Sequence, residues 1–379
     1  MRQSFLRHSI LVVGLVAGTV VHGQERSLSP PENAFARAVA RRDFSFPRDD
    51  SNHPGFKTEW WYLTGSLVTE EGERFGYQAT WFRSARAPRI SDRRSHLATR
   101  DLFFFHGALT DTRRRAFVFD EIASRGASTW ASSRPDLLRV VVLGRFLERA
   151  DAGHWRASFT VDGRRVDLVL EPTTPPLLHG VEPGLSRKGD APGQASYYYS
   201  RPRLRTRGTI QRDVGGPALA VTGTTWFDHE FGSNQLSDDQ VGWDWFSTTL
   251  DDGTDLMLYS LRQDDGSIEP ASSGTLRTAS GERVHLKRDD FIIEPLEEWE
   301  SPRTGGRYPS RWRLRVPAHQ IELDVEPVLA DQELDTRGST GVRYWEGLCR
   351  YRGRIGAQAV SGHGYVELVG YAGRFRARI

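Results

Sequence analysis

The residues best suited to chemistry lie in the segment 223–236, which reads GTTWFDHEFGSNQL. Asp228, His229 and Glu230 stand there among aromatic residues, and a histidine beside carboxylates is suited to transferring protons. On a strand the two carboxylates face one way, whereas His229 faces the other way with the flanking aromatic rings. The triplet is therefore a candidate catalytic group, although a lone histidine in such a place is more often a core residue with satisfied hydrogen bonds.

Large aromatic side chains close to this triplet offer a wall for a flat, apolar molecule. So much aromatic surface favours a ligand site over a plain core position for the histidine. The candidate ligand-binding residues in this part of the chain are Trp226, Phe231, Trp243, Trp245 and Tyr259.

A second unusual segment, 53–67, reads HPGFKTEWWYLTGSL and sets Glu59 directly against Trp60, Trp61 and Tyr62. A carboxylate beside so much aromatic surface is costly unless it has a partner or a purpose. The favoured interpretation is a buried ion pair with an arginine across a domain boundary, which would fix how two domains dock. The alternative is a proton donor whose pKa is raised by its apolar neighbours. All four residues are candidate ligand-binding positions.

Other kinds of active site find little support in the sequence. There is no G-x-S-x-G motif, and Cys349, the only cysteine, shares a strand face with Trp345 and Tyr351, which predicts a core residue and argues against a classical serine or cysteine hydrolase. The catalytic triplet with His53 or His106 would offer metal ligands, but no H-E-x-x-H motif or clustered histidine pair occurs. Glycine-rich phosphate loops are absent too. No metal and no other cofactor is expected.

Apolar residues alternate with polar ones along most of the chain, which predicts antiparallel strands. In the segment 154–172, HWRASFTVDGRRVDLVLEP, this alternation flanks a central Asp-Gly pair and predicts a hairpin with a type I′ turn. The segments 310–317 and 320–327 alternate in the same way. Strong helical periodicity occurs only in 31–44, PENAFARAVARRDF, which predicts a short N-terminal helix. With 37 glycines available for tight turns, the pattern is typical of the all-β class.

An internal repeat indicates two similar domains. The segment 59–67, EWWYLTGSL, aligns with 242–250, GWDWFSTTL, and in each copy an acidic turn with a glycine and an apolar strand ending in arginine follow. The same hairpin thus occurs twice, although a chance match of two aromatic strands is the alternative. The repeat predicts one domain over 24–205, which includes the short helix, and a second over 206–379.

Motifs in order along the chain resemble the family that contains AttH and the carotenoid 1,2-hydratases. They extend from His53 to Tyr371 and read HPGFKTEWWYLTGSL, FGYQATWFR, SYYYSRPRL, GTTWFDHEFGSNQL, WDWFSTTLDDGTDLMLY, and YWEG followed by GYVELVGY. The resemblance implies two tandem lipocalin-like (calycin) antiparallel barrels packed side by side, in agreement with the repeat. It also implies ligand space near the junction of the barrels, walled by the tryptophan motifs.

The hydratases add an expectation about chemistry. Hydration of an isolated alkene needs an acid that protonates carbon, and tryptophan faces stabilise the resulting cation. The resemblance implies a tryptophan two positions after the histidine and an acid two positions after a tyrosine, but these places hold Phe231 and Leu261. Carotenoid hydration is therefore doubtful for this chain. Pericyclases related to this fold need no acid, because shape and a few hydrogen bonds suffice.

Two functions follow from these observations. The first is an exported protein that binds an extended hydrophobic ligand, such as a lipid, isoprenoid or polyene, near the junction of the barrels. The second is an enzyme of the hydratase or pericyclase type that acts on such a ligand, with His229 and a nearby carboxylate as acid and base. The missing acid and the retained aromatic walls favour the first function slightly.

Residues 1–23 have the pattern of a secretory signal peptide. Two arginines precede an apolar run over 10–21, shorter than the roughly 20 residues that cross a bilayer, and small residues surround a cleavage point near Gly23. Cleavage predicts a secreted or periplasmic protein without a membrane span; an uncleaved anchor is the alternative. The 51 Lys and Arg are interspersed with 49 Asp and Glu, which argues against a nucleic-acid partner. The expected partner is a small hydrophobic ligand, and the sequence does not identify which exporter or lipid-handling protein it would meet.

Overall fold

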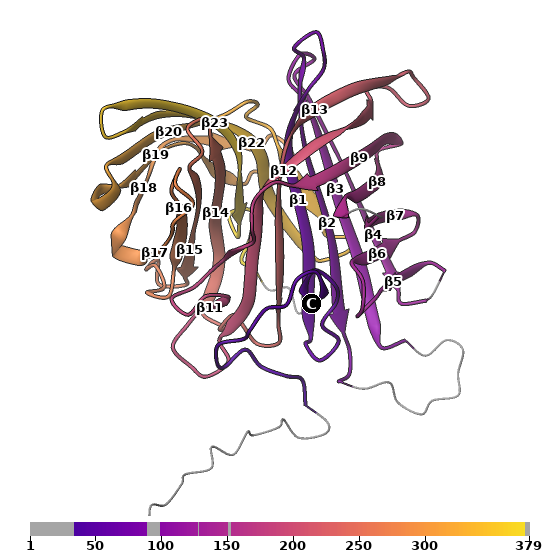
Figure 1. Cartoon of the computed structure of the whole chain (residues 1–379), viewed down its shortest axis with the longest axis horizontal. Coiled ribbons are helices and arrows are strands. Elements are labelled where there is room, and N and C mark those ends of the chain that lie inside the picture. The colour runs from indigo at the N-terminus through magenta and orange to yellow at the C-terminus, as the bar shows by residue number, and fades with distance from the viewer. Residues whose placement is uncertain (1–33, 89–98, 128, 151–152, 376–379) are drawn as a thin grey trace, which may run out of the picture.

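The strands of the described residues form two curled antiparallel sheets (Figure 1). The computed structural model describes residues 34–88, 99–127, 129–150 and 153–375. The first sheet forms a nearly closed barrel and the second a half-barrel, and they stand side by side. The expected all-β class with two lipocalin-like barrels is confirmed. The leader predicted for residues 1–23 lies outside the described residues.

The first sheet has 13 strands in the order β4-β3-β2-β1-β13-β12-β9-β8-β7-β6-β5, while β10 and β11 pair with β12. The first strand, β1, thus pairs with β13, which comes much later in the chain. The strands are β1 (Thr58–Val68), β2 (Arg74–Ala85), β3 (Asp101–Asp111), β4 (Ala116–Arg125), β5 (Ala131–Ser133), β6 (Arg139–Val142), β7 (Arg145–Arg149), β8 (Trp155–Val161), β9 (Arg164–Pro172), β10 (Leu177–Leu178), β11 (Leu185–Arg187), β12 (Ala195–Gln211) and β13 (Ala218–Gly232).

The second sheet has ten strands in the order β17-β16-β15-β14-β23-β22-β20-β19-β18, while β21 pairs with β22. Its strands are β14 (Gln240–Leu250), β15 (Asp255–Gln263), β16 (Ser273–Arg277), β17 (Arg283–Lys287), β18 (Ile292–Glu300), β19 (Arg307–Val316), β20 (Ile321–Pro327), β21 (Glu333–Thr336), β22 (Val342–Ile355) and β23 (Gln358–Val369). Short 3₁₀ helices occur at η1 (Arg48–Asp50), η3 (Arg288–Asp290) and η4 (Pro317–His319). Among the described residues, no helix has the length and hydrophobicity to span a membrane.

The repeated hairpin forms the first two strands of each sheet along the chain. The pair β1–β2 corresponds to β14–β15, and the turn glycines Gly72 and Gly253 both have positive φ, which a glycine adopts without strain. In each sheet the first strand also pairs with the last one, β1 with β13 and β14 with β23. The chain changes sheet between Gly232 and Gln240. The expected domain divide at 205/206 instead falls inside β12, because the repeat marks where the second sheet begins and not where the first ends.

Each sheet encloses its own apolar core, as period-two alternation requires. The hairpin predicted for 154–172 is confirmed as β8–β9, with Asp162 and Gly163 at positive φ in its turn. The alternating segments at 310–317 and 320–327 form β19 and β20 and fill the second core. Cys349 is fully buried in that core beside Trp345 and Tyr351, as predicted.

The helix predicted for 31–44 is not found in residues 34–44, the part of it that the structure describes. Val39, a residue of its expected apolar face, is 57% exposed, whereas Ala38 is buried. The segment runs without regular structure near the end of the first barrel, and Phe44 packs edge-on against Tyr197 and Tyr199 of β12. These tertiary contacts outweigh the helical periodicity, because a short isolated helix is marginally stable in water.

Candidate functional site

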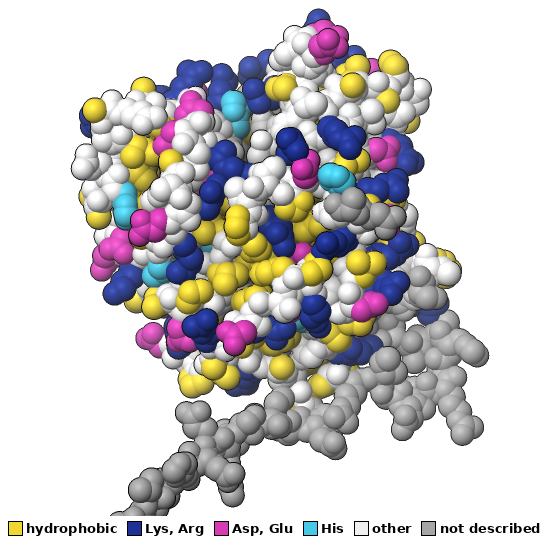
Figure 2. Space-filling model, in the orientation of Figure 1, with side chains coloured by type: hydrophobic (Ala, Val, Ile, Leu, Met, Phe, Trp, Pro, Cys, Tyr) yellow, Lys and Arg dark blue, Asp and Glu magenta, His cyan; other side chains and the backbone are white. Residues whose placement is uncertain are grey.

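The two sheets meet along a seam where β1 lies against β23, β2 against β22 and β12 against β14, and β13 contributes Trp226. Every second side chain of these strands points into the seam. Figure 2 shows apolar side chains gathered in the middle of the face along which the sheets meet. The aromatic cluster that fills the seam has the buried members Tyr62, Tyr198, Trp226, Trp245, Met257, Tyr259, Leu261, Leu348 and Tyr365, with Trp60 and Trp243 packed against it.

A groove of about 350 Å³ opens at one end of the seam. Its rim is polar and includes Arg74 and His363. Its apolar lining includes Trp226, Leu348 and Tyr365, which also belong to the aromatic cluster. The groove therefore joins a polar entrance to the aromatic interior of the seam.

Asp228 lies one pleat beyond Trp226 on the seam face of β13 and is buried. The indole Nε1 of Trp226 donates to Oδ1 of Asp228 at 2.6 Å, and the Tyr198 hydroxyl donates to Oδ2 at 2.6 Å. Ser200 donates to the same carboxyl group. Burial raises the pKa of Asp228 to about 7, although these three hydrogen bonds oppose the rise. A carboxylic acid thus stands beside aromatic rings, partly protonated near neutral pH.

Glu346 and Glu367 form a pair of carboxyl groups in the seam. They are directly opposite each other on β22 and β23, where two like charges would repel. The Tyr62 hydroxyl donates to Glu346 at 2.6 Å across the seam, and Trp243 donates to Glu367 at 3.0 Å. Burial raises the pKa of Glu346 well above its ordinary value, and it raises that of Glu367 to about 7. The pair therefore holds at least one proton at neutral pH.

Glu230, the third member of the predicted triplet, has a charged partner in the seam. Its carboxylate lies 3.5 Å from the ammonium group of Lys188, and Ser196 donates to it. The same ammonium group lies 4.0 Å from the ring centre of Tyr259, at cation–π distance. Glu230 thus takes part in an ion pair within the first sheet, and the lysine of that pair contacts Tyr259 of the second sheet, which is a structural role.

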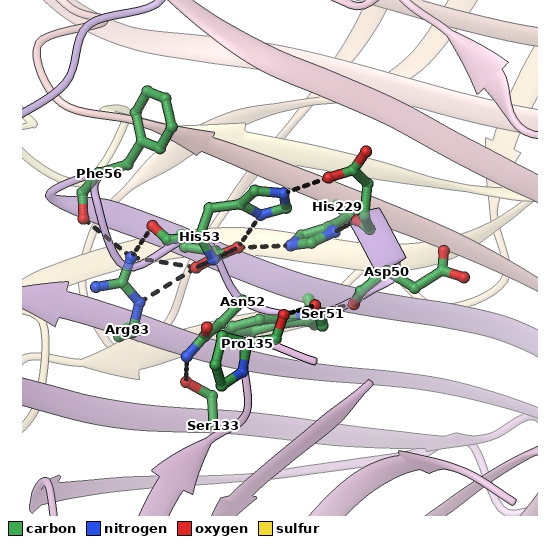
Figure 3. A network of polar contacts seen from close by, with 12 residues as sticks. Asp50, Ser51, Asn52, His53, Phe56, Arg83, Ser133, Pro135 and His229 are labelled. Atoms are coloured by element: carbon green, nitrogen blue, oxygen red, sulfur yellow. Dashed lines mark hydrogen bonds and ion pairs between the residues drawn. The ribbon is translucent and has the colours of Figure 1, made fainter. Parts of the chain in front are cut away.

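A separate polar site, the histidine cluster of His53, Glu59 and His229, lies inside the first barrel (Figure 3). Glu59 is fully buried, and its Oε1 is 2.8 Å from Nδ1 of His53 and 2.9 Å from Nε2 of His229. Arg83, the cross-strand neighbour of Glu59, donates to Oε2 at 3.2 Å. The main-chain N–H of His53 completes the set with a hydrogen bond of 2.9 Å to Oε2.

Hydrogen bonds and a neighbouring charge keep Glu59 ionised despite its burial. Burial alone would raise the pKa of Glu59, but hydrogen bonds from His229 and His53 and the charge of Arg83 outweigh it and hold this pKa below its ordinary value. Burial lowers the pKa of His229, although Glu59 opposes that shift. Glu59 is therefore an ionised carboxylate, and the expectation that it could act as an acid with a raised pKa is wrong.

Aromatic rings enclose the histidine cluster on several sides. Trp61 stacks on His229 with ring centres 5.1 Å apart and donates its indole N–H to the main-chain oxygen of Asp50. Phe231 stacks on His53 with ring centres 3.6 Å apart. These two predicted ligand-binding residues are therefore packed inside the first barrel and do not line the groove.

The structure divides the predicted catalytic triplet between two sites. The alternation of faces is as expected, because Asp228 and Glu230 point into the seam while His229 points into the first barrel. The aromatic rings Trp226, Trp245 and Tyr259 lie on the seam side, away from His229. His229 and Asp228 therefore cannot act together on one ligand, because the sheet separates them.

Glu59 does form a buried ion pair, but not the predicted one. Its partner Arg83 belongs to the adjacent strand β2 of the same sheet, so the pair does not cross the domain boundary. Contacts that do cross the seam come from other residues. Examples are Tyr62 with Glu346, and Trp245, whose indole donates to the Tyr198 hydroxyl at 3.1 Å.

Several residues of the two sites carried no individual prediction from the sequence. Tyr198, Glu346 and Glu367 lie within the motifs SYYYSRPRL, YWEG and GYVELVGY, so the carboxylates beside aromatic residues in the last two were a usable signal. Arg83 was visible only as the arginine that ends the repeated hairpin. Asp49, which contacts the histidine cluster, has no such signal, because only the fold brings it there.

Comparisons with known proteins agree with this architecture. The AttH-like family model matches residues 37–371. The structure of an AttH from Nitrosomonas europaea has 35% sequence identity and a TM-score of 0.80, covering 89% of this chain and 100% of that one. Kievitone hydratase from Nectria haematococca has 16% identity and a TM-score of 0.67, covering 90% and 97%, which shows a shared fold alone. The search of curated proteins gives no match. The chain belongs to the AttH-like family.

Proposed function

We propose that the protein binds an extended hydrophobic ligand, such as a lipid, isoprenoid or polyene, in the groove between the two barrels. The observation that carries this proposal is the groove of about 350 Å³, whose lining reaches Trp226, Leu348 and Tyr365. Its polar rim and aromatic interior suit a molecule with an apolar chain and a more polar end. The volume is near the lower end of the range of roughly 300–1,000 Å³ seen for small-molecule sites. A long polyene would therefore insert only one end.

A groove-filling variant tests the binding function. Thr249 lines the groove on β14 and is partly exposed, so Thr249→Trp fills the space without removing a core side chain. The control is Thr160→Trp on β8, another partly exposed strand threonine that lies outside the groove lining. With cis-parinaric acid as a fluorescent polyene probe, Thr249→Trp should weaken binding at least tenfold, while the control binds like the wild type. Equal affinities for all three proteins would refute binding in the groove.

The pair Glu346 and Glu367 supports a second candidate, an enzyme that hydrates an isolated alkene. Glu367 lies one pleat beyond Tyr365 of the groove lining and retains a proton near neutral pH. Its carboxyl group would transfer that proton to an alkene carbon, water would add to the cation, and the carboxylate would take the released proton back. The surrounding aromatic faces would stabilise the cation. A protein with the same fold, kievitone hydratase, is named as a hydratase, which is in keeping with this second candidate.

Mass spectrometry distinguishes the two functions. If the protein is a hydratase, incubation with geranylgeraniol should give a product heavier by one water, and Glu367→Gln should abolish it while leaving probe binding intact. Recovery of unchanged geranylgeraniol after long incubation, together with tight binding, supports the binding function. His229 is not assigned a role in this reaction, because it lies on the opposite face of β13.

We also propose that the protein is exported from the cytoplasm. The leader pattern in residues 1–23 supports an exported protein that meets its ligand outside the cytoplasm. Cell fractionation followed by N-terminal sequencing tests it: the exported form should begin near residue 24. A chain that retains its first residues in the cytoplasmic fraction would refute export.

A further inference from the structure

The ring proton of His229 has only one place that satisfies its neighbours. Its Nδ1 lies 3.1 Å from the main-chain oxygen of Asp49, which can only accept, and 3.1 Å from the Tyr199 hydroxyl. That hydroxyl lies 2.8 Å from Oδ1 of Asp50, to which it donates its single proton. The Tyr199 oxygen is then free to accept but has no second proton to give. Nδ1 of His229 must therefore carry the ring proton.

With a proton on Nδ1, the ring of His229 turns Nε2 towards Glu59. Oε1 of Glu59 is 2.9 Å from this Nε2, and the same oxygen is 2.8 Å from Nδ1 of His53. Glu59 is ionised beside Arg83, so its oxygen is an acceptor. Nε2 and Oε1 at this distance need a positive charge between them, which a second ring proton on His229 or a bound metal ion would supply.

We propose that His53, Glu59 and His229 bind a divalent transition-metal ion, with zinc as the best match. Two imidazole nitrogens and one carboxylate oxygen are a donor set that zinc accepts, and the three ligand atoms lie within 4.8 Å of one another. The contact of Nδ1 with the main-chain oxygen of Asp49 is of the kind that orients metal-binding histidines.

The position of this site in the fold gives the metal a structural role. His53 comes from the segment before β1, Glu59 from β1 and His229 from β13, and all three are buried. A metal bound here ties the irregular segment that follows η1 to two neighbouring strands of the first barrel. The groove is lined by the opposite end of β1, residues 64–68, so metal binding is independent of the proposed ligand site.

Metal analysis of the purified protein tests the proposal. Protein stripped with a chelator and then dialysed with zinc sulfate should retain one zinc per chain and melt at a higher temperature than the stripped form. His53→Gln and His229→Gln should each lose this stoichiometric zinc. The control His106→Gln should keep it, because His106 is a buried histidine outside the cluster, bonded to Tyr344 and Ser339.

A milder variant separates loss of metal from loss of folding. Tyr199→Phe removes one hydroxyl contact of His229 and leaves all three ligands, so zinc affinity should fall about 10- to 100-fold in a folded protein. Folded wild-type protein without stoichiometric zinc, or equal zinc uptake by the wild type and both histidine variants, would overturn the proposal. So would nitrogen NMR spectra in which both ring nitrogens of His229 carry protons at neutral pH, because a proton would then occupy the place of the metal.

Discussion

At the scale of single residues, the ion pair of Glu59 and Arg83 is buried inside the first barrel. The Arg83 side chain is 1% exposed and that of Glu59 is not exposed at all, so neither charge has water to replace a lost partner. Arg83 also donates to the main-chain oxygens of His53 and Phe56, which fixes the segment before β1. Removing one charge of such a pair leaves the other uncompensated.

Arg83→Met should therefore destabilise the protein by about 3–5 kcal/mol, because the buried Glu59 carboxylate would lose its guanidinium partner. Urea unfolding of the variant measures the loss. The control is Arg205→Met, since Arg205 pairs with Glu171 on the surface and water replaces that contact, so little change is expected. Similar losses in both variants would show that the burial of the pair is not what matters.

Glu367 predicts how stability depends on pH. The folded protein holds its proton up to a pKa of about 7, whereas the unfolded chain releases it near 4.5. The folded state therefore binds the extra proton between these values, and the free energy of unfolding falls as pH rises through this window, by up to about 3 kcal/mol. Urea unfolding at pH 5 and pH 8 should show a smaller fall for Glu367→Gln, which cannot ionise. An equal fall in variant and wild type would assign it to other groups.

At the scale of elements, the sequence predicted strands and their faces well, because period two is a direct geometric signal. It predicted the β8–β9 hairpin and the opposite faces of Asp228 and His229. It could not assign those faces to the seam and the barrel interior, since β13 is buried on both sides from Thr225 to Gly232 and no polar face marks the outside. The failed helix has a similar cause, because the contacts of Phe44 are tertiary.

Strand β2 approaches the second sheet closely at Gly76. A Cβ at this position would lie 2.7 Å from the Tyr365 hydroxyl and 2.8 Å from Cβ of Leu348, so a side chain there pushes the sheets apart. Gly76→Ala should lower stability by about 1–3 kcal/mol, measured by urea unfolding. Gly55→Ala is the control, since its Cβ would meet only Ala36 at 3.8 Å, and it should be tolerated. Wild-type stability of Gly76→Ala would mean that the seam is loose there.

At the scale of the whole molecule, the aromatic repeat predicted two sheets, and a resemblance supplied their barrel shape. The residue at which the first sheet ends could not be predicted from the sequence, because nothing in the residues of β12 indicates which sheet this strand joins. The seam was predicted only as an aromatic junction. Its polar half, such as the 2.9 Å contact of His106 with Tyr344 and the 2.8 Å bond from Thr110 to Gln332, depends on residues far apart in the chain.

These contacts across the seam should make the two barrels unfold together. Arg203 of the first sheet lies 2.8 Å from the fully buried carboxylate of Asp255 in the second, so separating the sheets would remove one of its two arginine partners and leave only Arg277. Differential scanning calorimetry should give one transition with equal calorimetric and van't Hoff enthalpies. Two resolved transitions would show that each barrel is stable without the other.

The pairing of β1 with β13 has a consequence for the order in which the chain acquires its shape. During synthesis, Thr58–Val68 emerges early and pairs with β2, but its other edge stays open until Ala218–Gly232 has been made. An open strand edge of this length invites pairing with other chains. The nascent protein would therefore depend on a holding chaperone until more than half of its length has left the ribosome.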